Sequence, residues 1–285
     1  MKVVLVGAQG MLGTDLQWAF QAQDVVSLSK AQLLIDHLDD VRACIRQEQP
    51  DLIINAAAYT NVDACENNVE DAYRVNAVGP RNLAVAAQEA GAALVHFSTD
   101  YVFAGDATEP QREFDPVGPT SIYGKSKLAG ERLVQSLCPR HYILRTSWLY
   151  GVHGRNFVST MLQLGQKQDV VRVVDDQMGS PTYTVDLANA VSQLVQKPYY
   201  GIYHLSNQGV CTWHQFAKDI FQAAQLDVRV EAMSSTELAR PAKRPSYSVL
   251  DNQMWRLNGF APLRPYRAAL QDYLAQYQSL SGGVV

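Results

Sequence analysis

Tyr123 and Lys127 are the residues of this sequence best suited to move a proton. They lie four positions apart, and on a helix this spacing puts both side chains on one face. A nearby ammonium group favours the ionised form of a tyrosine, whose pKa is ordinarily about 10. The pair is therefore suited to exchange a proton at neutral pH. Because the Tyr-x-x-x-Lys motif alone is weak, its interpretation depends on the rest of the chain.

Hydroxyl groups follow the apolar segment 93–97 at the point where it ends. Ser98, Thr99 and Asp100 come next in the sequence. If the segment is a strand of an open parallel sheet, these side chains lie at its carboxyl end, the edge where such sheets bind ligands. Thr99 is thus a candidate partner for Tyr123 and Lys127.

A loop with the pattern Gly-x-x-Gly-x-x-Gly follows the first apolar segment, residues 3–6. Glycines allow a tight turn and a close approach of pyrophosphate, and the helix expected next offers free N–H groups and a positive dipole end. The pattern predicts a dinucleotide site whose contacts are Gly7, Gly10, Met11, Leu12 and Gly13.

Ser29 and Lys30 follow the apolar segment 25–28, where an NAD-binding chain usually carries an acid that holds the ribose 2′-hydroxyl. A serine and a lysine can accept a 2′-phosphate, whereas a carboxylate would repel it. We therefore expect NADPH, with NADH possible. In the alternative interpretation Lys30 is only a solvated loop charge. Asp36 is a further candidate, for the adenine side of the site.

Apolar segments of strand length alternate with helix-like patterns across the first half of the chain. They are apolar nearly throughout, as expected for a parallel sheet covered on both faces, and comprise residues 3–6, 25–28, 52–54, 93–97 and 142–144. Helices are expected from near Met11, from near Asp39, across residues 69–90 and from near Tyr123. This order predicts an α/β fold, a Rossmann-like doubly wound parallel sheet.

The order loosens after residue 150. We expect residues 1–150 to form an NAD(P)-binding domain and residues 151–285 a smaller C-terminal substrate-binding lobe, with segments that return to the first domain. Breaks rich in Pro and Gly at residues 179–181 and 240–245 indicate loops around a site. Helices are expected at 157–166, 185–196, 213–224 and 267–277, and strands at 170–174, 202–205 and 228–231.

The composition is that of an ordinary globular protein. Of the 285 residues, 47% are hydrophobic and 18% charged, and the formal net charge is −4. These values argue against a disordered chain and against a nucleic-acid-binding surface, and no apolar run approaches the roughly 20 residues of a membrane span. Four separate cysteines without a Cys-x-x-Cys pair, and histidines without metal-binding spacing, predict a reduced, cytoplasmic protein with no metal site.

The glycine loop, the Ser-Thr pair after the fourth strand and the Tyr–Lys pair occur in the order typical of the extended short-chain dehydrogenase/reductase superfamily. Within it, the chain resembles the dTDP-4-dehydrorhamnose reductase family over nearly its whole length. The stretches that carry the resemblance are residues 55–60, 98–103, 123–131, 145–150, 176–182 and 240–245.

The resemblance implies that a hydride from the nicotinamide reduces the C4 ketone of dTDP-4-dehydro-L-rhamnose to give dTDP-L-rhamnose. It makes Tyr123 the proton donor, Lys127 the ligand of the nicotinamide ribose that lowers the tyrosine pKa, and Thr99 the hydroxyl that tunes the pair. The residues implied beside the cofactor are Ala58, Tyr59, Thr60, Phe97, Tyr123 and Lys127. Those implied for the substrate are Thr99, Asp100, Tyr123, Trp148 on the sugar and Arg244 on the diphosphate.

Two features depart from the family. Some members carry an acid at the position of Ser29, which leaves the cofactor preference open. Some pair through acidic residues near the C-terminus that hold magnesium, whereas residues 270–276 contain a single acid here. We therefore expect a monomer or a weak homodimer.

Other functions remain as alternatives. Dehydratases of the superfamily place Asp-Glu after the threonine, whereas Tyr101 follows Asp100 here. Another nucleotide-sugar reductase stays open, as does a non-catalytic NADP-binding regulatory subunit resembling that of methionine adenosyltransferase. The presence of Thr99, Tyr123 and Lys127 together favours catalysis.

Overall fold

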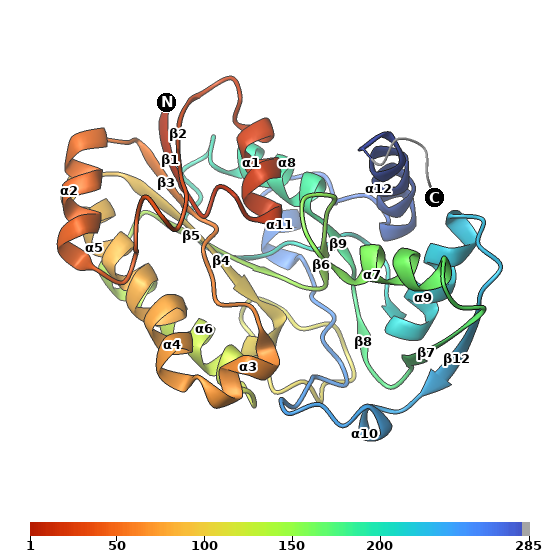
Figure 1. Cartoon of the computed structure of the whole chain (residues 1–285). Helices are drawn as coiled ribbons and strands as arrows, with labels where there is room; N and C mark the ends of the chain where they lie inside the picture. Colours follow the sequence, from red (N-terminus) through yellow and green to blue (C-terminus); the bar gives the residue numbers. More distant parts are fainter. Residues whose placement is uncertain (281–285) are drawn as a thin grey trace.

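Six parallel strands form the central sheet of the computed structural model, which describes residues 1–280 (Figure 1). In spatial order they are β2 (Asp24–Leu28), β1 (Lys2–Val6), β3 (Leu52–Asn55), β4 (Ala93–Thr99), β5 (His141–Thr146) and β10 (Gly201–His204). The chain order reverses between β1 and β3, the switch point at which open parallel sheets bind ligands. The predicted doubly wound sheet is confirmed.

Helices cover both faces of the sheet. Val3 and Leu5 of β1 point to one face and Val4 and Val6 to the other, because successive side chains of a strand alternate. Since both faces are covered, the central strands β1, β3 and β4 are largely apolar and show no alternating pattern. The first face packs on α1 (Met11–Ala19), α8 (Thr184–Leu194) and α11 (Gln253–Leu257), and the second on α2 (Leu38–Glu48), α5 (Gly79–Ala90) and α6 (Ile122–Leu137).

The prediction of one continuous α-helix over residues 69–90 is wrong for the middle of that segment. A π-helical stretch, Arg74–Val78, separates α4 (Val69–Tyr73) from α5. Asn76 in this stretch is fully buried, and its amide accepts a hydrogen bond from the N–H of Tyr59 at 2.8 Å and donates one to the Tyr59 carbonyl at 3.0 Å. Apolar periodicity does not reveal such a widened turn, which is frequent at functional sites.

A smaller lobe lies beside the carboxyl ends of the strands, with its own aromatic-rich core (Figure 1). The chain then returns to the sheet, because α8 packs on α1 and β10 is the edge strand beside β5. The domain boundary at residue 150 stays a prediction. The lobe contains α7 (Phe157–Gly165), β7 (Val170–Val174), α9 (Trp213–Ala223), β12 (Arg229–Met233), α10 (Ser235–Leu238) and α12 (Tyr266–Leu280), with the short strand pairs β6 (Leu149–Tyr150) with β9 (Thr182–Tyr183) and β8 (Met178–Gly179) with β11 (Cys211–Thr212).

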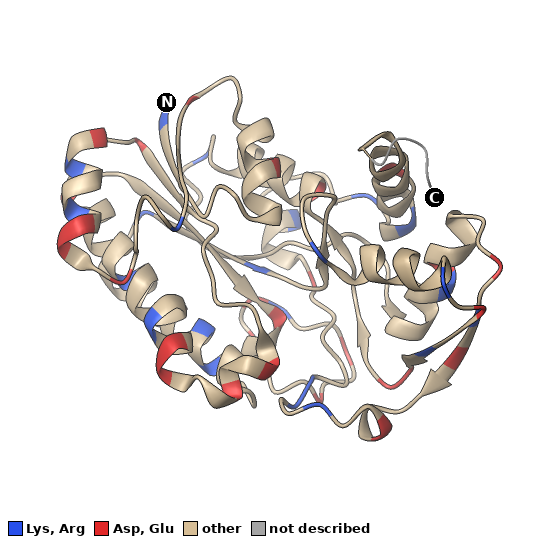
Figure 2. Ribbon diagram, viewed as in Figure 1, with Lys and Arg blue, Asp and Glu red and all other residues tan. Residues whose placement is uncertain are grey.

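Two short elements complete the part of the fold that surrounds the strand ends. A six-residue helix, α3 (Val62–Asn67), follows β3, and a 3-10 turn, Asp100–Val102, follows β4. Basic and acidic positions are intermixed along the outer helices, such as α2 and α5 (Figure 2).

Candidate active site

The glycine loop connects β1 to α1 at the switch point. Gly7 has a φ of +78°, which residues with side chains rarely adopt. A Cβ on Gly13 would come within 2.2 Å of the Gly7 carbonyl oxygen. Gly10 caps α1 without a side-chain hydrogen bond, so the N–H groups of the first turn, at Met11 and Leu12, are available to an anion. The loop therefore has the space and the donors that a pyrophosphate needs.

A cavity of about 400 Å³ opens on one side of this loop. The Ser29 hydroxyl donates to Oε1 of Gln32 at 2.7 Å, whereas Lys30 is exposed. Asp36 forms an ion pair with Arg74 at 3.4 Å, a cation that the sequence did not mark as part of the site. Of the predicted cofactor residues, this cavity is lined by Gly7, Gly10, Ser29, Lys30, Asp36, Ala58 and Tyr59.

A second cavity, of about 530 Å³, lies between the sheet and the lobe. Loops after β1, β3, β4 and β5 meet there, because the carboxyl ends of parallel strands share one edge of the sheet. The lobe contributes Arg155, Asn156 and Trp213, which the sequence analysis did not include. The predicted residues in its lining are Gly10, Met11, Leu12, Gly13, Ala58, Thr60, Phe97, Thr99, Asp100, Tyr123, Lys127 and Trp148.

Tyr123 and Lys127 lie one turn apart on α6. Lys127 is 2% exposed, and its ammonium donates a hydrogen bond to the Phe97 carbonyl at 2.6 Å. Burial lowers the pKa of Lys127 to about 8. Burial also raises the pKa of Tyr123, with hydrogen bonding to Thr99 opposing part of that effect. This direction is opposite to the lowered tyrosine pKa expected from the sequence, and it leaves Tyr123 protonated, which is the form that a proton donor requires.

Three buried oxygen atoms at the ends of β4 and β5 have no hydrogen-bond partner within residues 1–280. They are Oδ2 of Asp100, Oγ of Ser98 and Oγ1 of Thr146. The other carboxylate oxygen of Asp100 accepts a hydrogen bond from the Thr99 hydroxyl at 2.8 Å, and burial raises the pKa of Asp100 to about 6. The residues that carry these oxygens line the 530 Å³ cavity, whereas the oxygen atoms themselves are buried.

Trp148, which follows β5, is clamped between two neighbours. Its backbone φ is +47°, in the left-handed region. One ring face stacks on Trp213 of α9, with centroids 3.6 Å apart and planes within 6°. A Cβ on Gly179 would lie 2.3 Å from Cε2 and 2.6 Å from both Cζ2 and Nε1, which places it over the opposite face. Both faces are thus covered by the protein, and the ring is left to present its edge to the cavity.

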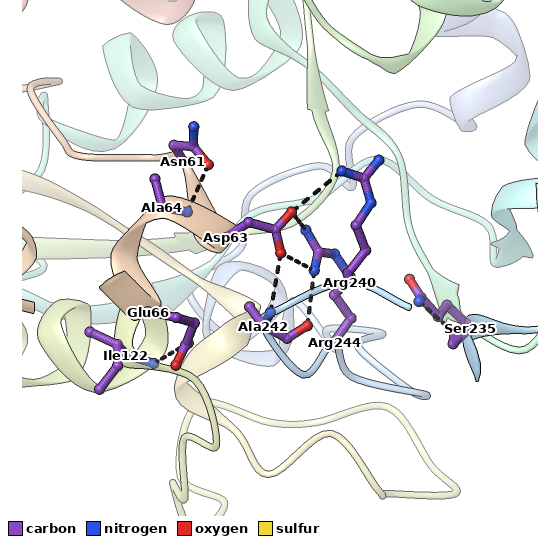
Figure 3. Close-up of polar contacts among 10 residues, drawn as sticks. Asn61, Asp63, Ala64, Glu66, Ile122, Ser235, Arg240, Ala242 and Arg244 are labelled. Carbon is purple, nitrogen blue, oxygen red and sulfur yellow. Dashed lines mark hydrogen bonds and ion pairs between the residues drawn. The ribbon is translucent and has the colours of Figure 1, made fainter. Parts of the chain in front are cut away.

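The start of α6, which carries Tyr123, is fixed by two side chains that the sequence did not reveal. Glu66 of α3 accepts a hydrogen bond from the Ile122 N–H at 2.9 Å (Figure 3). Asn76 donates one to the Ser126 hydroxyl at 3.1 Å. Both contacts join segments far apart in the chain, so no local pattern signals them.

Arg244 lies outside the 530 Å³ cavity and lines a separate one of about 300 Å³. Its guanidinium forms an ion pair with Asp63 of α3 at 2.8 Å, so it joins α3 to the segment after α10 (Figure 3). The predicted contact between Arg244 and a diphosphate stays a proposal.

No group of three or more His, Cys, Asp or Glu side chains within residues 1–280 is placed to hold a metal ion. Asp272, the single acid of the segment 270–276, binds Arg264. None of the helices described is long and apolar enough to cross a membrane.

A family model described as the RmlD substrate binding domain matches residues 1–279. The spore coat polysaccharide biosynthesis protein SpsK of Bacillus subtilis (strain 168) is 43% identical to this chain over 280 residues, which cover 98% of each protein. The dTDP-4-dehydrorhamnose reductase of Streptomyces griseus is 43% identical over 94% of this chain and 91% of its own.

Among solved structures, dTDP-4-dehydrorhamnose reductase from Bacillus anthracis str. Ames in complex with NADP is 43% identical to this chain. The two superpose with a TM-score of 0.95 over 96% of this chain and 99% of that one.

Proposed function

Because this chain belongs to the RmlD substrate binding domain family, we propose that it is an NADPH-dependent oxidoreductase that reduces the C4 ketone of dTDP-4-dehydro-L-rhamnose to give dTDP-L-rhamnose. One observation carries the proposal. A single cavity joins the glycine loop to Thr99, Tyr123 and Lys127. The NADP held by the Bacillus anthracis relative supports the choice of cofactor.

The direct test adds the nucleotide sugar to the purified chain, follows NADPH absorbance and compares the product with dTDP-L-rhamnose by chromatography. NADPH consumption with formation of that product supports the proposal. Binding of NADPH without turnover would instead favour a non-catalytic NADP-binding subunit. Turnover confined to a different keto-sugar nucleotide would assign the chain to another reductase.

Several side chains of the 530 Å³ cavity have separate roles in the reaction. Bound NADPH supplies the hydride. Tyr123 donates its proton to the carbonyl oxygen as negative charge develops there, and its raised pKa keeps the proton in place until then. Lys127 is largely charged at neutral pH and stabilises the tyrosinate that remains. Thr99 donates a hydrogen bond to the Asp100 carboxylate, and both residues line the cavity in which the sugar would lie.

The remaining substrate contacts come from two loops. The edge of Trp148 bounds the sugar, and Arg244 binds the diphosphate. A cytoplasmic location, the absence of nucleic-acid and membrane partners, and a monomer or weak homodimer remain part of this proposal.

We expect kcat/KM to fall as pH rises through about 8, because Lys127 loses its charge there while Tyr123 keeps its proton. A pH profile of the parent and of Lys127→Arg checks this, since a guanidinium stays charged across the range. The residual activity of Lys127→Arg should lack the decline near pH 8. The same decline in both proteins would exclude Lys127 as its origin.

NADPH should be used at least as well as NADH, because Ser29 and Lys30 stand where an NAD-specific site carries an acid. Lys30→Ala should raise KM for NADPH a few-fold and leave KM for NADH unchanged, since an exposed charge pair contributes about 0.2–1 kcal/mol. Comparing kcat/KM for the two cofactors in both proteins measures this. A strong NADH preference that survives in Lys30→Ala would contradict it.

A further inference from the structure

Asp63 forms ion pairs with two arginines, Arg240 and Arg244 (Figure 3). Its carboxylate accepts hydrogen bonds from both terminal nitrogens of Arg244, each at 2.8 Å, and from the backbone N–H of Ala242 at 3.2 Å. The Asp63 and Arg244 side chains are only 21% and 20% exposed, whereas Arg240, at 3.5 Å from the carboxylate, is 54% exposed. The pair of Asp63 with Arg244 is thus the shielded and well-aligned one.

This pairing leaves a defined edge of Arg244 unused. A guanidinium carries five N–H donors in one rigid plane. Nη1 donates to Asp63 and to the Ala242 carbonyl, the latter at 2.9 Å, and Nη2 donates once to Asp63. Within residues 1–280 the two donors that remain are Nε–H and the second N–H of Nη2. They point side by side from the same edge, the geometry that binds two oxygens of a phosphate.

Arg244 lines one cavity and lies near a residue of another. Together with Arg240 and Lys243 it lines the cavity of about 300 Å³. Tyr101, which lines the 530 Å³ cavity, is near enough for the guanidinium charge of Arg244 to lower its pKa against the larger effect of burial. The Tyr101 ring meets the ring of Tyr123 edge-on, with centroids 5.5 Å apart. An anion on Arg244 would therefore be held one aromatic ring away from the proton donor.

We propose that Asp63 is a positioning residue for diphosphate recognition, holding Arg244 so that its free edge receives the diphosphate of the nucleotide sugar. The inference rests on the proposed function, which supplies that substrate. Asp63 offers no donor to an anion, and by charge alone it would repel one. Its contribution is to fix a long side chain whose ordering would otherwise oppose binding.

The direction in which diphosphate affinity changes when Asp63 is removed therefore distinguishes a positioning role from an effect of charge alone. If Asp63 positions Arg244, its removal weakens diphosphate binding. If Asp63 only neutralises the arginines, its removal strengthens diphosphate binding, because more positive charge is left to attract the anion.

The experiment titrates dTDP alone by calorimetry and measures KM and kcat for the nucleotide sugar in Asp63→Asn, Arg244→Gln and the double variant. Asp63→Asn should weaken dTDP binding and raise KM roughly tenfold, the order expected for one hydrogen bond to a charged group. The change in kcat should be smaller, and NADPH affinity should not change. In the Arg244→Gln background Asp63→Asn should add nothing, because no guanidinium is left to position.

Glu89→Gln is the matched control. Glu89 of α5 accepts hydrogen bonds from two nitrogens of Arg42 of α2, at 3.1 and 2.6 Å. Neither residue lines the 530 Å³ cavity or the 300 Å³ cavity. Loss of the Glu89 charge should leave dTDP binding at the parent level. Asp63→Glu keeps the charge but moves the carboxylate, so binding should be intermediate.

Unchanged or tighter dTDP binding in a cooperatively melting Asp63→Asn would overturn the inference. If Asp63→Asn does not fold, parent-level dTDP binding in Asp63→Glu overturns it instead. Should Arg244→Gln weaken dTDP binding while Asp63→Asn does not, the diphosphate contact stands and only the positioning role fails. A parent that binds dTDP but does not consume NADPH with the nucleotide sugar would contradict the proposed function separately.

Discussion

Tyr123→Phe is expected to lose about 10²–10⁴-fold in kcat, the usual contribution of a general acid, while binding NADPH as the parent does. Phenylalanine keeps the ring that meets Tyr101 edge-on at 5.5 Å and removes only the hydroxyl. Stopped-flow measurement of NADPH oxidation gives the rate, and a fluorescence titration gives the cofactor affinity. The two readouts distinguish loss of the proton donor from loss of the site.

A second tyrosine serves as the control. Tyr142 is buried near the amino end of β5, whereas the candidate site lies at the carboxyl ends of the strands, and its hydroxyl donates to the Lys197 carbonyl. Tyr142→Phe should therefore melt at a lower temperature yet keep its turnover. Parent-like turnover in Tyr123→Phe would mean that another group supplies the proton.

The sequence predicted the sheet well because both of its faces are covered. Segments such as residues 52–54 and 142–144 are apolar throughout, as expected of parallel strands that are covered on both faces. It did not predict the π-helical stretch, Arg74–Val78. The reason for that turn is the burial of Asn76 against the Tyr59 loop, a contact made only once the chain has folded.

The sequence predicted those residues of the candidate site that belong to a motif. It did not predict those that are brought there by contacts between distant segments of the chain. The spacing of Tyr123 and Lys127, and the position of Thr99 after a strand, brought the three into one cavity. Their electrostatics were not predictable, because burial, which no motif reveals, is the largest effect on the tyrosine pKa and raises it. Asp63 shows no motif, since its partner Arg244 is distant in sequence and reaches it only across the fold.

Trp148→Ala is expected to lower kcat by roughly 10²-fold, since a misplacement of about 1 Å costs about that much. The ring edge bounds the cavity, so its loss should disturb the sugar more than the nucleotide. Affinity for dTDP and for NADPH should hold. Steady-state kinetics together with dTDP calorimetry separate the two effects. Loss of cooperative melting in Trp148→Ala would mean instead that the ring is mainly a core residue.

Gly179→Ala tests the same placement without removing the indole. A Cβ at this position would lie 2.3 Å from Cε2 of Trp148, and Trp213 stacks at 3.6 Å on the other face. The ring cannot retreat, so it must tilt, and its edge must move within the cavity. Gly179→Ala should therefore lower kcat in the same direction as Trp148→Ala, although Gly179 itself is absent from the cavity lining. Pairing Gly179→Ala with Trp213→Ala frees one face of the ring and should restore part of the rate. If the single variant keeps parent kcat, the position of the indole edge does not govern how the sugar is held.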